Sequence, residues 1–261
     1  MQVITWFLIL LIPLRDSQSI RKPVYNGQPA PPRQLRELVY PPDSWEFFLQ
    51  HLPTEDKPIV DFNGNLVSNQ GKHVAILPFD VGHTDLQQCA DALIRIRAEY
   101  LFRKKLYPSI GFHFISGSFY SYSNYLKGMR PVLKGRGMIF KLAATTSVIT
   151  HGSLRKYLDI VYAYANTVSL CNELKYTNRL ETGTIIIFPG NPGHCCMIFD
   201  AAVSEKSDTV FKILEGYMPA QSIYVLSNPY EPDWNPWYHL GKGEISTSSC
   251  IFKSYYLRKF E

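Results

Sequence analysis

The sequence lacks the short motifs that indicate several common kinds of chemistry. It has no Cys-x-x-Cys pair, which argues against a structural zinc site, because such sites usually draw their thiolate ligands from closely spaced cysteines. It has no G-x-S-x-G, H-E-x-x-H or phosphate-binding loop pattern. We therefore expect no metal ion and no cofactor.

The sequence also lacks a concentrated basic stripe. The 261 residues carry a formal net charge of +5, and the basic residues are scattered apart from a short cluster at 103–105. A nucleic-acid-binding surface needs a coherent basic patch interleaved with aromatic side chains that stack on bases. Nucleic acid is therefore not expected as a partner.

Long apolar runs are absent except at the N-terminus. Residues 3–14 form a run of about a dozen apolar residues, whereas a bilayer-spanning helix needs about 20. Ser17 and Ser19 follow with the spacing of a signal cleavage site, although no Lys or Arg follows Met1. We predict a cleaved signal peptide over 1–19, which would make the protein secreted or part of the periplasm or cell envelope. The alternative is an uncleaved, membrane-proximal anchor. After signal removal we expect no stable transmembrane segment.

The remaining chain predicts one domain of the α+β class. Residues 20–42 are rich in proline and polar residues and are interpreted as an extended linker, so the domain is predicted over 43–261. Helices and runs of adjacent strands occur without regular βαβ alternation, which favours helices packed on a mostly antiparallel sheet. The main expected elements are a short helix capped by Asp43 or Ser44, a helix starting with a Thr84–Gln87 capping box, one long helix capped by Ser153, and strands at 184–188 and 194–203.

Five cysteines, at positions 89, 171, 195, 196 and 250, are an odd number. At least one thiol must therefore remain free or pair between chains. Cys195 and Cys196 are adjacent on a predicted strand, so their side chains should point to opposite faces and not bridge each other.

One cysteine has the setting that nucleophilic catalysis needs. Cys89 lies early in the strongest predicted helix, where the partial positive charge of the helix N-terminus lowers a thiol pKa. His194 begins a strand and can serve as the base, with Glu215 or alternatively Gln221 orienting its ring. Gln88 can donate a hydrogen bond to a developing oxyanion. The alternative is that Cys89 is a buried packing residue and His194 a turn residue.

A second group of residues is a candidate for ligand binding. Arg97 falls on the apolar face of its own helix, where a guanidinium needs an acidic partner or must reach an edge. The serine-rich, aromatic segment after Phe114 can line a groove for sugar or peptide, although such aromatics are often half-buried packing residues. The candidate binding residues are Arg97, Tyr120, Tyr122 and Tyr217.

Several longer motifs occur in an order that resembles a known family. These are DLQQCADALIRIRAEYLF, YLDIVYAYANTVSL, PGHCCMIFDAA, GYMPAQSIYVLSNP and PWY. Together they resemble the exported bacterial proteins described as domain of unknown function 4846, from about Ser44 to the C-terminus. Cys89 and His194 match that pattern, whereas Cys195 and Cys196 depart from it and Glu215 replaces a usual glutamine. The resemblance implies membership but no activity.

A more distant resemblance concerns the papain-like cysteine peptidases of the NlpC and CHAP types. Those enzymes carry a cysteine near a helix N-terminus, then a histidine opening a strand, then a polar residue one strand later; Cys89, His194 and Glu215 keep that order. The resemblance implies a papain-like core and a thiol hydrolase acting on cell-wall peptide or another amide. The alternative function is a non-catalytic envelope protein that binds glycan or peptide in the same groove.

Overall fold

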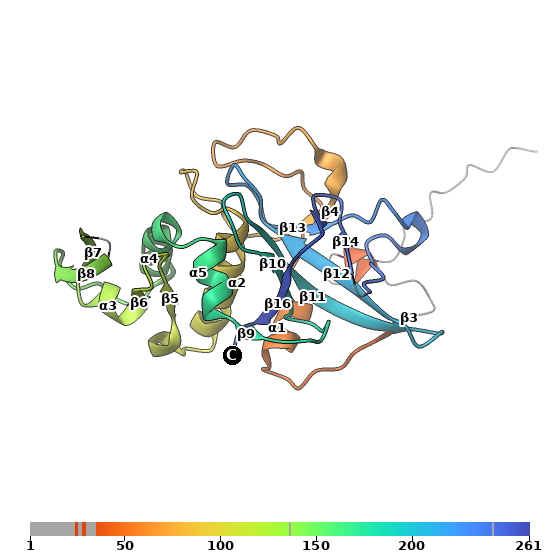
Figure 1. Cartoon of the computed structure of the whole chain (residues 1–261), viewed down its shortest axis with the longest axis horizontal. Coiled ribbons are helices and arrows are strands. Elements are labelled where there is room, and N and C mark those ends of the chain that lie inside the picture. Colours follow the sequence, from red (N-terminus) through yellow and green to blue (C-terminus); the bar gives the residue numbers. More distant parts are fainter. Residues whose placement is uncertain (1–23, 26–27, 30–34, 136, 242) are drawn as a thin grey trace, which may run out of the picture.

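An antiparallel sheet with helices packed on one face forms the larger part of the molecule (Figure 1). The structure is a computed structural model that describes residues 24–25, 28–29, 35–135, 137–241 and 243–261; the predicted signal peptide lies outside these residues. The order across the sheet is β4 (His73–Ile76), β13 (Tyr224–Leu226), β12 (Thr209–Glu215), β11 (His194–Ser204), β10 (Ile185–Phe188), β16 (Tyr256–Lys259) and β9 (Lys175–Tyr176). The expected α+β class with a mostly antiparallel sheet is therefore confirmed.

The long strand β11 organises the sheet. Its first half pairs with β10 and its second half with β3 (Leu35–Glu37), while β12 runs along its other edge. Successive side chains on a strand point to opposite faces. Cys195, Met197 and Phe199 accordingly join the core under the helices, whereas Cys196 and Ile198 join a second core on the other face.

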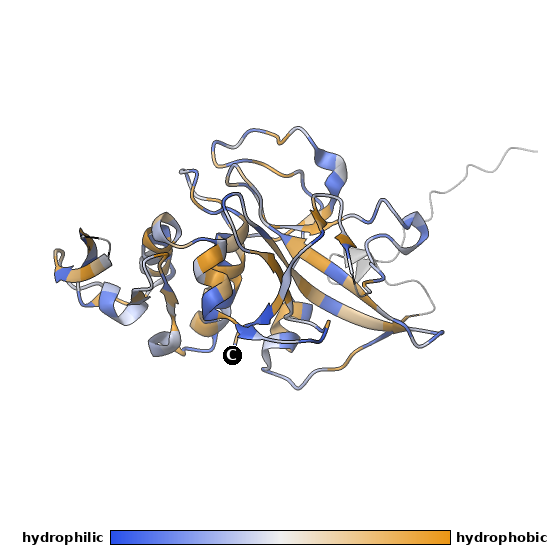
Figure 2. Ribbon diagram, viewed as in Figure 1, coloured by the Kyte–Doolittle hydropathy of each residue, from blue (hydrophilic) through white to orange (hydrophobic). Residues whose placement is uncertain are grey.

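Two helices, α2 (Cys89–Arg103) and α5 (Thr167–Glu173), stand between the sheet and a smaller outer layer, as Figure 1 shows. α1 (Trp45–Gln50) packs against β11, and its N-cap is Ser44, one of the two predicted caps. The outer layer contains α4 (His151–Tyr164), α3 (Tyr122–Leu126), and the hairpins of β5 (Gly111–His113) with β6 (Phe119–Ser121) and β7 (Met129–Lys134) with β8 (Gly137–Leu142). The apolar sides of α2 and α5 stand out in Figure 2.

The remaining described elements are short. They are the strands β1 (Val24–Tyr25), β2 (Gln28–Pro29), β14 (Ile245–Ser246) and β15 (Ile251–Phe252), and the 3-10 turns η1 (Gln70–Lys72), η2 (Tyr107–Ser109) and η3 (Pro232–Trp234). Strand β3 pairs with β11 ahead of the predicted domain start at 43, so the fold reaches into the segment interpreted as a linker.

The start of α2 differs from the predicted capping box. The helix begins at Cys89 with Gln88 as N-cap, and the Asp91 carboxylate accepts the Gln88 N–H at 3.1 Å. The predicted partner of Thr84 is used elsewhere, because the side-chain oxygen of Gln87 accepts from Arg155 at 2.7 Å. Cys89 is therefore the first residue of the helix.

The predicted long helix after Ser153 is two helices. Ala165 is extended, and the side-chain oxygen of Asn166 accepts the backbone N–H groups of Val168 and Ser169, which caps α5. Asparagine competes with the helix for backbone hydrogen bonds, so it favours a cap over a helix interior. The N-cap of α4 is Thr150. Ser153 is the third residue of the helix and the second member of the capping box.

Candidate active site

Cys89 lies where the N-terminus of α2 meets the sheet. Two glycines bring the neighbouring chain segments close to it. A Cβ at Gly216, directly after β12, would lie 2.7 Å from the Ala92 Cβ, so the chain can pass the first turn of α2 only without a side chain. A Cβ at Gly193 would lie 2.2 Å from the Thr167 hydroxyl of α5. The turn before His194 is therefore held against α5, which fixes where β11 begins.

The Cys89 thiol has a strongly lowered pKa of about 5. The main cause is a hydrogen bond from the Cys195 thiol, and a hydrogen bond and the positive charge of His194 lower the pKa further. Burial opposes these effects, since Cys89 is only 9% exposed. The Ala90 N–H adds a further donor. Hydrogen bonds to a thiolate favour the charged form, so Cys89 is a thiolate at neutral pH.

His194 connects the thiolate to a buried carboxylate. Its Nε2 lies 2.9 Å from Oε2 of Glu215, which leaves Nδ1 as the ring nitrogen for the Cys89 sulfur. Burial disfavours the imidazolium, but the hydrogen bonds to Cys89 and Glu215 and their negative charges outweigh it and raise the pKa of His194 to about 9. Between about pH 5 and about pH 9 the site therefore holds a thiolate–imidazolium pair.

Glu215 is the last residue of β12 and is fully buried. Its second oxygen accepts a hydrogen bond from the Tyr224 hydroxyl at 2.5 Å. Burial, followed by the charge and hydrogen bond of Glu215, raises the pKa of Tyr224, so this phenol stays a donor. Both carboxylate oxygens thus have partners, and the imidazole is held in one orientation.

The loop before Cys89 is anchored by an ion-pair network. Asp80 contacts Arg95 at 3.2 Å and Arg155 at 3.4 Å, and Gln87 accepts from both arginines. Arg95 also pairs with Glu99 at 2.8 Å. These contacts tie the loop to α2 and α4, so the segment that leads into Cys89 is held in place.

The structure brings together most of the predicted catalytic residues. Cys89, His194 and Glu215 meet as described. Gln88 caps α2, and its side-chain amide donates to Asp85 at 3.1 Å. Of the two candidate orienting residues, Glu215 contacts His194. Gln221 is buried, and its amide group has no hydrogen-bond partner among the described residues.

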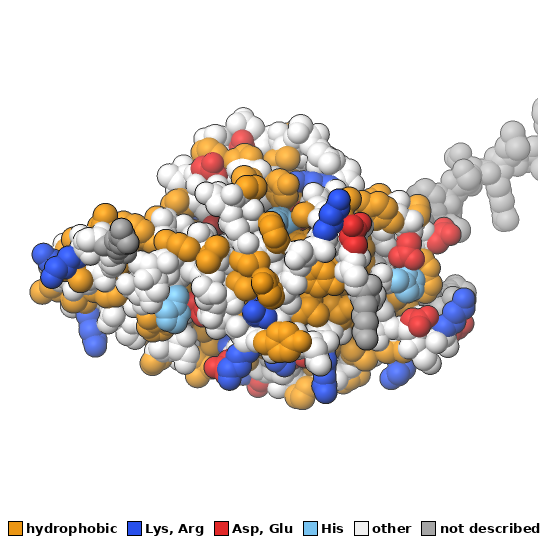
Figure 3. Space-filling model, viewed as in Figure 1, with side chains coloured by type: hydrophobic (Ala, Val, Ile, Leu, Met, Phe, Trp, Pro, Cys, Tyr) orange, Lys and Arg blue, Asp and Glu red, His pale blue; other side chains and the backbone are white. Residues whose placement is uncertain are grey.

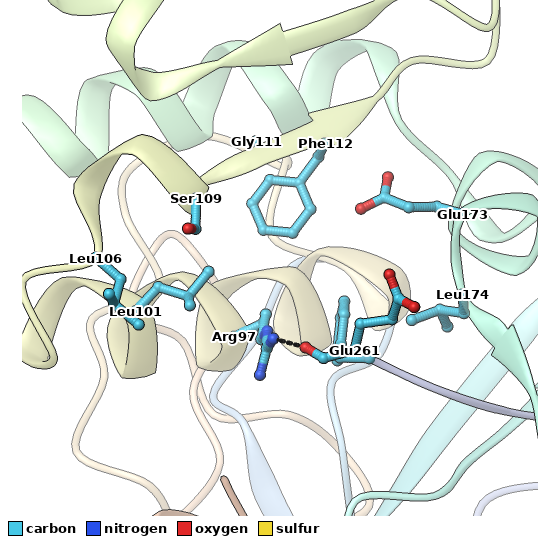
Figure 4. A pocket seen from close by; sticks show the side chains of 10 residues that line it. Arg97, Leu101, Leu106, Ser109, Gly111, Phe112, Glu173, Leu174 and Glu261 are labelled. Carbon is cyan, nitrogen blue, oxygen red and sulfur yellow. Dashed lines mark hydrogen bonds between the residues drawn. The ribbon is translucent and has the colours of Figure 1, made fainter. Parts of the chain in front are cut away.

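The predicted binding residues separate into three places. The Tyr217 ring lies 5.2 Å from the His194 ring and belongs to the site. Tyr120 and Tyr122 are fully buried, and their hydroxyls contact Met129 and Ser153; the prediction that they line a groove is not supported, because their rings pack in the core. Arg97 lines a separate cavity of about 510 Å³ two turns along α2, where its guanidinium donates to the backbone carbonyl of Glu261 (Figure 4).

Four residues in or beside the candidate active site were not found by sequence reasoning, namely Lys72, Asp85, Cys195 and Tyr224. Cys195 departs from the family pattern, and that departure ruled it out as a nucleophile but did not indicate that its thiol would contact Cys89. Asp85 joins Gln88 to the Ala220 N–H at 2.7 Å. A usable signal existed only for Tyr224, because it lies on the strand that follows Glu215.

Removing the Cys195 thiol should raise the pKa of Cys89. The Cys195→Ala variant loses the hydrogen bond that contributes most to the low value, so the thiolate forms at higher pH. The measurement is the pH dependence of thiolate absorbance in the ultraviolet. Cys196→Ala is the matched control, since Cys196 is equally buried but faces the second core. An unchanged Cys89 titration in Cys195→Ala would contradict this assignment.

The described residues hold no cluster of three or more His, Cys, Asp or Glu side chains that could bind a metal ion. Within the same part of the chain, no helix is long and apolar enough to cross a membrane. On the face drawn in Figure 3, lysine and arginine side chains are scattered among acidic and apolar ones.

The fold and site define an α+β protein in which a helix-borne cysteine faces a histidine–glutamate pair. The chain belongs to the family described as domain of unknown function 4846, whose family profile matches residues 27–259. No curated protein sequence and no solved structure was found to match.

Proposed function

We propose that this protein is a cysteine-dependent hydrolase of amide bonds. The single observation that carries the proposal is the meeting of Cys89, His194 and Glu215, in which the thiol contacts the imidazole and the imidazole contacts a buried carboxylate. A nucleophile, a base and an orienting group within hydrogen-bond reach are the requirements of nucleophilic catalysis. The strongly perturbed pKa values of Cys89 and His194 add support, because such shifts concentrate at functional sites.

In the proposed reaction the Cys89 thiolate attacks the amide carbonyl carbon, and the carbonyl electrons move to oxygen. We assign the stabilisation of that oxyanion to a backbone N–H at the start of α2 and to the second N–H of the Gln88 amide, whose first N–H donates to Asp85. As the C–N bond breaks, His194 gives its proton to the leaving amine, and a thioester to Cys89 remains. Water then attacks the thioester with His194 as base, which releases the acid and restores the thiolate–imidazolium pair.

We propose further that the core is papain-like and that the substrate is a cell-wall peptide. The first proposal is supported by a cysteine at a helix N-terminus packed on antiparallel strands that carry the histidine and the acid. The second rests on the sequence of the N-terminal 19 residues, whose export signal would place the protein at the cell envelope. The choice of a cell-wall peptide also rests on the resemblance to the NlpC-type and CHAP-type peptidases.

The alkylation rate of Cys89 tests the thiolate directly. We expect the rate with iodoacetamide to rise as the pH passes about 5 and to stay high through neutral pH, because a lowered pKa leaves the thiolate populated above that value. An ordinary thiol reaches the same rate only near pH 8 to 9, at about its unperturbed pKa. Mass spectrometry of the labelled peptide identifies the residue.

Turnover decides between hydrolysis and binding. Purified cell-wall peptides are incubated with the protein, and the new amine and acid ends are followed by mass spectrometry. A low-pH thiolate together with cleavage supports the hydrolase. If Cys89 reacts only above pH 8 and the peptide binds but is not cut, the hydrolase proposal is wrong and the envelope-binding function is favoured. That function has lost the support of Tyr120 and Tyr122, which are in the core.

A further inference from the structure

Lys72 is a buried cation at the edge of the candidate active site. It is the last residue of η1 and is 7% exposed. Its backbone is fixed from two sides, because its carbonyl accepts from the Ser227 N–H at 2.9 Å and from the Ser248 hydroxyl at 2.8 Å. The position of the side chain therefore does not depend on a flexible loop.

The Lys72 ammonium faces two tyrosine rings that also face the catalytic residues. Nζ lies 4.6 Å from the ring centroid of Tyr217 and 4.8 Å from that of Tyr224. Tyr217 is the ring that packs on His194, and Tyr224 is the phenol that bonds Glu215. The Tyr217 ring thus contacts both the ammonium and the imidazole.

The ammonium has no hydrogen-bond acceptor within the described residues; its contacts there are the two rings and the charge of Glu215 at longer range. A lysine ammonium carries three N–H donors, and donors that meet no acceptor in the protein are available to a ligand. The faces of the two tyrosine rings attract the cation but do not take up its three N–H groups as a carboxylate would. Burial accordingly lowers the pKa of Lys72, and the negative charge of Glu215 acts in the opposite direction.

We propose that Lys72 is an anion subsite that binds a free carboxylate of the substrate, one or two residues from the amide that is cut. One residue of an extended chain spans at most about 3.6 Å. A carboxylate one or two residues from the scissile amide can therefore lie beside the Tyr217 ring, where it meets the Lys72 ammonium. The inference deepens the proposed hydrolase function and rests on it. It identifies the substrate class as peptides with a free acid next to the cleavage point.

Alkylation with a charged and a neutral reagent tests the subsite without any substrate. Iodoacetate carries a carboxylate and iodoacetamide does not, so their rate ratio at Cys89 reports the local cationic field. We expect Lys72→Met to lower the iodoacetate-to-iodoacetamide ratio by roughly fivefold, as loss of one nearby charge in a medium of intermediate dielectric predicts. Lys72→Arg should keep the ratio, because it keeps the charge.

Lys156→Met is the matched control, since this lysine is exposed on α4. It should leave the ratio unchanged. Thermal unfolding of each variant establishes that the fold is intact. A ratio that is unchanged in Lys72→Met, or that falls equally in Lys156→Met, would overturn the subsite.

A pair of peptides separates this inference from the hydrolase proposal. The two peptides differ only in a free carboxylate or a carboxamide beside the scissile bond. We expect Lys72→Met to raise KM for the acid about tenfold relative to the carboxamide, the size of one charge-assisted hydrogen bond. A lowered alkylation ratio without cleavage of either peptide would refute the hydrolase and leave the anion subsite standing. Cleavage of both peptides with no change in relative KM would refute the subsite alone.

Discussion

Replacing Cys89 with alanine should lower kcat/KM for any amide substrate by at least about 10³-fold, since removing the nucleophile of a thiol or serine hydrolase leaves only binding and oxyanion stabilisation. In the proposed mechanism the thiolate acts in bond formation and not in substrate capture, so the loss should appear in kcat. Initial rates over a range of substrate concentrations give both constants.

Cys171→Ala controls for the general effect of removing a buried thiol. Cys171 lies in α5 and is 6% exposed, so its substitution leaves a similar small cavity without removing the Cys89 thiol. Turnover should stay within a factor of a few of the wild type. Equal activity of Cys89→Ala and Cys171→Ala would remove Cys89 from the mechanism.

Replacing Glu215 with glutamine should have the second largest effect, a loss of at least about tenfold in kcat, because the neutral amide keeps a hydrogen bond to His194 but not the charge that stabilises its imidazolium. Glutamine keeps the shape of the side chain but not its charge. The carboxylate helps to raise the pKa of His194 to about 9, so the pKa should fall in this variant. The thiolate loses its charged partner at the same time, which raises the pKa of Cys89.

The pH profile distinguishes this role from a purely structural one. The alkaline limb of the wild-type profile should lie near pH 9, where the imidazolium is lost, and it should move to lower pH in Glu215→Gln. The matched control is Glu231→Gln, because Glu231 pairs with His239 at 3.0 Å on the surface. A Glu215→Gln profile with unmoved limbs would show that the carboxylate does not act through His194.

The elements that carry Cys89 and His194 could be predicted from the sequence because they depend on local features. A cysteine in the strongest helix and a histidine after a Pro-Gly turn are both local signals, and both fell on the expected elements. The choice between Glu215 and Gln221 could not be made. It depends on which side chain crosses to β11, and the register of β12 against β11 sets that.

Other features were beyond sequence reasoning because distant side chains decide them. The helix α2 starts at Cys89 and not at the predicted Thr84–Gln87 box, because the Gln87 side chain is held by two arginines from separate helices. The sequence around Tyr120 and Tyr122 is typical of a groove, but both side chains are fully buried in the folded chain. Lys72 gives no signal at all, because a lone lysine before a strand is normally exposed.

His194 and Cys195 are neighbours at the start of β11, and both contact the same sulfur. A slip of β11 by one residue would exchange the faces of the two side chains and remove both contacts. The unusual acidity of Cys89 thus depends on correct pairing of strands that are far apart in the chain. Alkylation of this thiol at mildly acidic pH is therefore a chemical reporter of folding, since only molecules with the native strand register carry a reactive sulfur there.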